Sequence, residues 1–184
     1  MVAWLPLAVA FTGLTGLVYL VAQQNLRLGA NEPQIQLAED AATRLAAGVD
    51  PADVVAKGNV NVASSLSPFI TVYDAARKIA ASNARLDGQT PDLPAGVLDY
   101  TLAHGRDRVT WQPRTGVRQA IVAVYFHGRK TGFVVAGRSL REVEKRVDTL
   151  GAIVGAAWLV ILLASLAAAI VVQWFAARLA PRRS

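Results

Sequence analysis

The chain has 184 residues, 53% of them hydrophobic, and carries 19 Lys and Arg against 13 Asp and Glu, a formal net charge of +6. It contains no cysteine, which excludes a disulfide framework and thiolate chemistry. The positive balance does not indicate a nucleic-acid partner, because residues 23–148 mix 16 cations with 13 anions and form no basic stripe.

Two apolar runs without charged residues, 2–22 and 149–177, stand on either side of this polar segment. Each reaches the roughly 20 residues that a helix needs to cross a ~30 Å hydrocarbon layer. We therefore predict two transmembrane helices around an outer domain at 23–148. The first run could instead be a cleaved signal peptide, although Leu20 is not the small residue expected two positions before a cut after Ala22.

The basic residues predict the orientation. Residues 178–184 hold three arginines and no acid, which is typical of a short cytoplasmic tail. Two spans return the chain to its starting side. We therefore expect both termini in the cytoplasm and residues 23–148 outside.

The polar segment opens with two predicted helices. Pro33 suits a first helical position and Gly48 a C-terminal cap, with a mostly alanine stripe between them. Asp50 and Pro51 then predict a short second helix that ends at Gly58.

A change to β-type patterns follows at Pro68. The expected strands are 69–74, 78–82, 108–112, 118–126 and 132–138, with a helix at 94–104 closed by Gly105. Local antiparallel connections then give an α+β domain, a five-stranded sheet with helices on one face and residues 120–124 at its buried centre.

The exit from this sheet carries a capping box, with Ser139 as N-cap and Glu142 three residues later. No helix breaker follows before Pro181. Apolar residues continue at helical spacing into the second span, so we predict one helix of about 40 residues, roughly 60 Å long, that can carry movement from the sheet to the cytoplasm.

Several stretches resemble the extracytoplasmic sensor region of bacterial two-component histidine kinases. They are NEPQIQLAED at 31–40, SLSPF at 65–69, VTWQP at 109–113 and, most specifically, AGRSLREVE at 136–144. The resemblance implies a PAS-like fold of the PDC or CACHE type between two transmembrane helices of the bacterial inner membrane. Only seven residues follow Ala177, so kinase activity is not carried over and signalling would need a separate partner.

Sensors of this kind hold small molecules between the sheet and its covering helices. Tyr73, Trp111, Arg118 and Arg138 lie on or beside predicted strands and could supply a ring, an indole donor and guanidinium groups for an acidic ligand. The alternative stays open that the aromatic residues are ordinary core residues and the arginines point into water.

No catalytic or metal-binding constellation is present in the pattern of residues. His104 and His127 lack ligand spacing, so we expect no metal, no cofactor and no enzyme. In the second span, Gly151 and Gly155 form a small-xxx-small pair that favours close helix packing, either with the first span or in a homodimer.

The sequence thus predicts a two-span membrane sensor or accessory signalling protein. Its outer domain would detect a signal, with or without a small-molecule ligand, and pass it to a separate histidine kinase, another membrane signalling protein or a transporter. The alternative is an envelope structural or assembly protein that senses nothing and uses the outer domain as a protein-binding surface.

Overall fold

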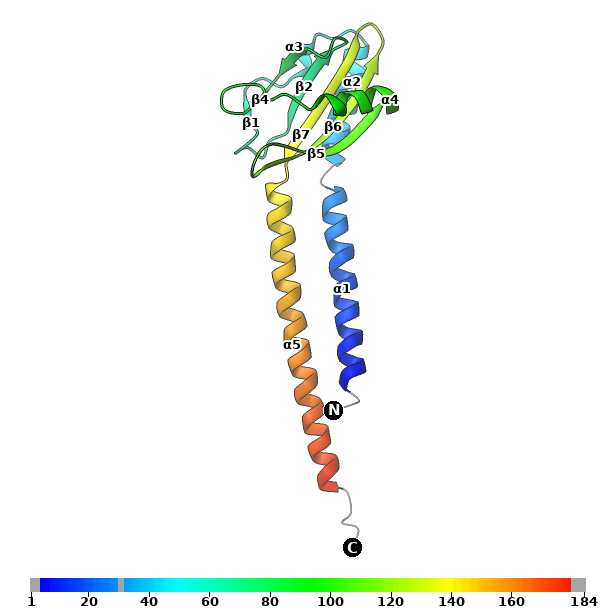
Figure 1. The fold of residues 1–184 in the computed structure, drawn as a ribbon, viewed down its shortest axis with the longest axis vertical. Helices are drawn as coiled ribbons and strands as arrows, with labels where there is room; N and C mark the ends of the chain where they lie inside the picture. The colour runs from blue at the N-terminus through cyan, green and yellow to red at the C-terminus, as the bar shows by residue number, and fades with distance from the viewer. Residues whose placement is uncertain (1–3, 30–31, 180–184) are drawn as a thin grey trace. The chain divides into compact units, whose positions relative to one another are not determined.

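A computed structural model describes residues 4–29 and 32–179 of the chain (Figure 1). The chain divides into two compact units. We call Met1–Leu26 with Lys145–Ser184 the helical unit, and Arg27–Glu144 the sheet unit.

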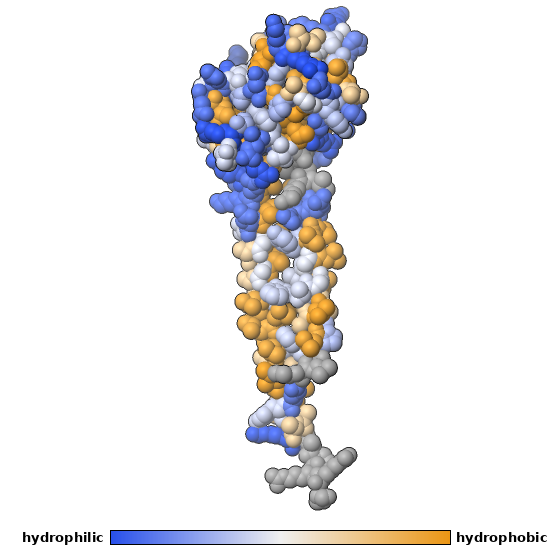
Figure 2. Space-filling model, viewed as in Figure 1, coloured by the Kyte–Doolittle hydropathy of each residue, from blue (hydrophilic) through white to orange (hydrophobic). Residues whose placement is uncertain are grey.

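The helical unit is built from two long helices, α1 (Trp4–Gly29) and α5 (Arg141–Leu179). Both are long and apolar enough to cross a membrane, and they leave large apolar side chains exposed along most of their length (Figure 2). Exposed apolar surface of this extent favours contact with lipid rather than water. The prediction of two apolar helices able to span a membrane is confirmed, whereas their orientation stays a prediction.

The sheet unit begins with α2 (Glu32–Ala46), which ends as its sequence predicts. Gly48 has a φ of 97°, its N–H donates to the Leu45 carbonyl, and the N–H of Val49 donates to the Arg44 carbonyl. These two bonds form a Schellman cap, which favours glycine because the left-handed conformation penalises a Cβ.

The next helix, α3 (Pro51–Val54), is shorter than predicted. Asp50 caps it by accepting from the Ala52 N–H at 3.0 Å, as Asp50 and Pro51 indicate. The helix ends at Val54 rather than Gly58, because Val55 already has extended backbone angles.

Five antiparallel strands form the main sheet in the order β3-β2-β7-β6-β5. The first and last of these strands along the chain, β2 and β7, are therefore neighbours. The strands are β2 (Phe69–Asp74), β3 (Ile79–Ser82), β5 (Arg106–Arg114), β6 (Val117–His127) and β7 (Thr131–Ser139). The prediction of an α+β fold with a five-stranded antiparallel sheet is confirmed.

A second, two-stranded sheet was not expected from the sequence. It pairs β1 (Val60–Asn61) with β4 (Ala84–Arg85) in parallel. Two residues per strand are too few to show an alternating pattern, so neither strand gives a signal in the sequence.

The prediction that helices cover only one face of the sheet is wrong. On one face, Leu98 of α4 (Ala95–His104) packs with Phe69, Ile121 and Phe133, and we call this the α4 face. On the other, the α2 face, residues of α2 and α3 pack against the alternate residues of the same strands (Figure 1). These contacts on the α2 face include Ala42, Leu45 and Val54 against Ile70, Val72 and Val134.

This double coverage explains the continuous apolar runs in the central strands. Residues 69–73 of β2 are all buried, as are residues 120–123 of β6. A strand covered on both faces loses the alternation of polar and apolar residues that marks a half-exposed strand. Of the run 120–124 predicted as the buried centre of the sheet, residues 120–123 are buried and Val124 is half-buried, while the middle strand of the five is β7.

Candidate ligand-binding and transmission sites

Two of the four predicted ligand-binding residues lie in the core on the α4 face. Tyr73 is 2% exposed and Trp111 7% exposed, and the Trp111 ring is 6.4 Å from that of Phe69. Burial, and then the negative charge of Asp92, raise the pKa of Tyr73 to about 12, although the nearby Leu93 backbone acts in the lowering direction. Its hydroxyl has no hydrogen-bond partner of acceptable geometry among the described residues.

The two predicted arginines are exposed and already engaged elsewhere. Arg118 Nη1 is 2.5 Å from Glu144 Oε1, and Arg138 Nε donates to the Leu66 carbonyl at 2.9 Å. The structure therefore places Tyr73 and Trp111 on one buried face, whereas it places both arginines in contacts with the start of α5 and the segment before β2.

The sequence reading missed one buried polar residue on the same face, Gln119. It is 1% exposed and lies opposite Trp111 in the pairing of β5 with β6. Its Nε2 donates to the Val62 carbonyl at 2.7 Å, but its Oε1 accepts no hydrogen bond from the described residues. The signal for it in the sequence was weak, because Gln119 follows Arg118 and stands before the apolar run of β6, where a polar residue is expected to face water.

Tyr73 and Gln119 thus give the α4 face a phenolic hydroxyl close to the Leu93 backbone and an amide oxygen, and neither atom makes a hydrogen bond of acceptable geometry with the described residues. Buried polar groups in native proteins are nearly always hydrogen-bonded to protein or water. The two groups lie at different levels of the sheet, because Tyr73 is level with Phe133 of β7 whereas Gln119 is level with Ser139. Each can bind a water molecule or a polar atom of a small ligand, and Trp111 lies opposite Gln119.

A cavity of about 430 Å³ lies elsewhere in the sheet unit, at the turn between β2 and β3. Val72 and Phe126 line it together with Lys130, whose ammonium donates to the Val49 carbonyl at 3.3 Å and lies 3.7 Å from Asp50 Oδ2. No predicted ligand residue except Tyr73 lines this cavity.

The start of α5 is the candidate transmission site. The first helical bond runs from the Glu144 N–H to the Leu140 carbonyl, and the helix begins at Arg141. The Ser139 hydroxyl accepts from the Arg141 N–H at 3.3 Å. Leu140 therefore occupies the N-cap position, one residue after the predicted Ser139, and Glu142 lies in the first turn. The helix then continues without a break to Leu179.

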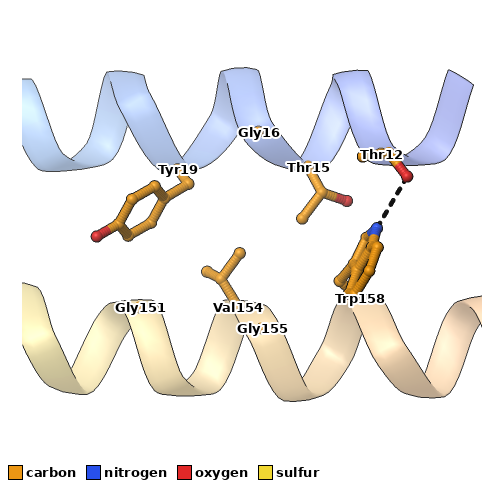
Figure 3. A pocket seen from close by; sticks show the side chains of 8 residues that line it. All are labelled: Thr12, Thr15, Gly16, Tyr19, Gly151, Val154, Gly155 and Trp158. Carbon is orange, nitrogen blue, oxygen red and sulfur yellow. Dashed lines mark hydrogen bonds between the residues drawn. The ribbon is translucent and has the colours of Figure 1, made fainter. Parts of the chain in front are cut away.

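Within the helical unit, the predicted glycine pair of α5 faces α1 (Figure 3). The indole of Trp158 donates to Thr12 Oγ1 at 3.0 Å, and the indole of Trp4 in α1 donates to Ser165 Oγ at 3.0 Å. Each helix thus contributes one tryptophan donor and one hydroxyl acceptor. These reciprocal bonds fix the register of the antiparallel pair.

The glycines do not bring the two backbones into close contact. A Cβ added at Gly155 would meet nothing within 4 Å, and one added at Gly151 would meet only the ring and hydroxyl of Tyr19. A cavity of about 390 Å³ remains between the helices. The glycine pair therefore lies between the two helices of one chain without close backbone contact, and a role for it in helix pairing stays a prediction.

The two histidines have ordinary partners. His104 stacks on Tyr100 with ring centroids 3.9 Å apart, and His127 Nδ1 is 3.2 Å from Thr131 Oγ1. Within the described residues, no group of three or more His, Asp or Glu side chains could hold a metal ion.

No model of a known protein family and no curated protein sequence matches this chain.

Proposed function

We propose that the chain is a two-span membrane sensor that reports an outer signal to a separate signalling protein. The observation that carries the proposal is the junction between β7 and α5. The last strand of a compact sheet unit leads, through Leu140 alone, into one uninterrupted helix that is apolar enough to cross a membrane. Any change in the position of β7 therefore acts directly on the start of that helix.

The sheet unit is, in this proposal, a PAS-like domain of the PDC or CACHE type outside the bacterial inner membrane. The antiparallel five-stranded sheet with its first and last strands adjacent at the centre supports the proposal. Both termini then lie in the cytoplasm, in keeping with the positive tail.

The signal is received on the α4 face. Tyr73 and Gln119 offer polar atoms that make no hydrogen bond of acceptable geometry with the described residues, and Trp111 offers apolar surface opposite Gln119. Arg118 and Arg138 belong to the transmission end instead, because Arg118 pairs with Glu144 in the first turn of α5 and Arg138 binds the Leu66 carbonyl before β2.

The partner is a histidine kinase, another membrane signalling protein or a transporter. Photo-crosslinking in host membranes, followed by purification in detergent and mass spectrometry, should recover one such protein. A crosslinker at exposed Val172 should capture it, and one at exposed Val9 serves as the comparison within the helical unit. Recovery of no membrane protein from cells grown under several conditions would contradict the proposal.

The alternative function is that of an envelope assembly protein. The outer surface of α4 favours it, because Tyr100 and Leu102 are 49% and 48% exposed and could contact another protein. Melting curves with a metabolite library separate the two functions. A ligand at 100 times its Kd should stabilise a sensor by about 2.7 kcal/mol, whereas an assembly protein should respond to none.

A further inference from the structure

The segment before β2, residues 61–67, is bound by side chains from three different elements. The carbonyl of Val62 accepts from Gln119 of β6 at 2.7 Å. The carbonyl of Leu66 accepts from Arg138 of β7 at 2.9 Å, and that of Ser64 accepts from Arg141 of α5 at 2.7 Å. Three alternate carbonyls of this segment thus accept hydrogen bonds from β6, from β7 and from the first turn of α5. We call residues 61–67 the latch segment.

The three bonds differ in their access to water. Val62 and Gln119 are each 1% exposed, so the bond between them lies in the core. Arg138, Arg141 and the acceptor residues Ser64 and Leu66 are exposed. Water can replace a guanidinium donor at the two exposed carbonyls, whereas opening the buried bond would strand both of its groups. The latch segment therefore has one fixed end and one end that can open.

The fixed end of the latch segment, at Val62, is also connected to the proposed ligand-binding side, the α4 face. The Val62 N–H donates to the Arg85 carbonyl and the Val60 N–H to the Asn83 carbonyl, which ties the segment to β4. The loop after β4 packs Leu86 and Leu93 against the core of the α4 face. The loop is thereby connected to the latch segment through backbone hydrogen bonds. A rearrangement of the loop can therefore shift residues 61–67.

We propose that Arg138 and Arg141 form a releasable latch, which couples the loop over the α4 face to the first turn of α5. When the latch is closed, the first turn follows the position of residues 61–67. When it opens, the Arg118–Glu144 ion pair and the bond from the Leu140 N–H to the Arg118 carbonyl still join the first turn to the sheet. The inference rests on the proposed sensor function and names its coupling element.

Hydrogen–deuterium exchange on the full chain in lipid nanodiscs tests the latch without ligand or partner. The double variant Arg138→Met and Arg141→Met removes both guanidinium donors and keeps the aliphatic stems. We expect amides of 61–67 and of the first turn of α5 to exchange at least about fivefold faster. Losing one hydrogen bond makes local opening of the backbone more frequent by about this factor. The amides of Ile121 and Val122 report global unfolding and should not change.

Arg108→Met is the matched control. Arg108 is exposed on β5, and its guanidinium makes no hydrogen bond or ion pair with the described residues. This variant should exchange like the wild type. Unchanged exchange in the double variant, or faster exchange confined to residues 61–67, would overturn the latch. Either result would leave the sensor proposal intact, because crosslinking to a partner tests that proposal separately. Should the double variant unfold globally, Arg141→Lys, which keeps the charge and loses the reach to Ser64, should give the same local change.

Discussion

At the scale of single residues, the α4 face contains buried polar atoms both with and without partners. Asn83 is satisfied, since its Oδ1 accepts from the Ile70 N–H at 2.8 Å in the core. Thr71 Oγ1 and Ser82 Oγ are 2.7 Å apart and share a hydrogen bond. The Tyr73 hydroxyl and Gln119 Oε1 have no such partner within the described part of the chain. This contrast makes the Tyr73 hydroxyl and Gln119 Oε1 the candidate ligand-binding atoms of this face, while Gln119 Nε2 serves the fold through its bond to the Val62 carbonyl.

The contrast predicts opposite effects of two similar substitutions. Tyr73→Phe removes a buried hydroxyl that makes no hydrogen bond of acceptable geometry with the described residues, so the free energy of unfolding should stay unchanged or rise by up to about 1 kcal/mol. Thr71→Val, on the same strand and face, should lower it by about 1 kcal/mol, because it breaks the bond to Ser82. Thermal melting of the full chain in one detergent compares the two. A clear loss of stability in Tyr73→Phe would show that the hydroxyl has a structural partner.

Tyr73 also predicts a change of stability with pH. Its pKa is about 12 in the folded protein against an ordinary 10.0, so the neutral phenol favours the folded state. This contribution is complete below pH 10 and is lost as the pH rises through 10 towards 12. The wild type should therefore lose more stability over this range than Tyr73→Phe, which has the same other tyrosines. Parallel declines in the two melting temperatures would contradict the burial of the phenol.

At the scale of elements, hydrophobic periodicity and capping residues predicted the individual helices and strands. The helix at 94–104 appears as α4, closed by Gly105 at a φ of 79°. The hairpin of β2 and β3 and the strands β5 to β7 also lie where alternation and turn residues indicate. Coverage of both sheet faces was not predicted, because pairing of distant segments decides which helix meets which face.

The candidate site was less predictable than the fold for a similar reason. Tyr73 and Trp111 share a face, but the sequence cannot tell that Arg118 and Arg138 reach Glu144 and Leu66 instead of that face. Long side chains at strand ends have many possible partners. Which of these partners is chosen depends on tertiary contacts that single-sequence patterns do not contain.

The central pairing of β2 with β7 leaves no room for a side chain at Gly132 or at Gly137. Gly137 of β7 lies opposite Phe69, and an added Cβ would overlap the Phe69 ring and the Ile121 side chain. Gly137→Ala should therefore lower the free energy of unfolding by about 1–3 kcal/mol, the usual cost of overpacking a core. Gly96→Ala is the control, since a Cβ there meets nothing within 4 Å and alanine favours a helix. Similar melting temperatures for the two variants would contradict the packing of β2 against β7.

At the scale of the whole molecule, α5 belongs to both units. Its first turn lies in the sheet unit, and the helix from Lys145 onwards lies in the helical unit. The helical unit has its own fixed register from the Trp4–Ser165 and Trp158–Thr12 bonds. In the proposed mechanism, α5 is the covalent connection through which the sheet unit acts on the paired helices.

The most direct test of this account breaks the helix between the two units. Val147→Pro removes an interior backbone bond and kinks α5 at a cost of about 3 kcal/mol, whereas Val147→Ala removes side-chain volume and keeps the helix. Partner output is measured in cells at matched abundance for both variants, and the melting of the sheet unit is followed in parallel. We predict that Val147→Pro loses or locks the output, that Val147→Ala retains it, and that the sheet unit melts alike in both. Normal, regulated output from Val147→Pro would contradict transmission through α5 and, with it, the proposed mechanism.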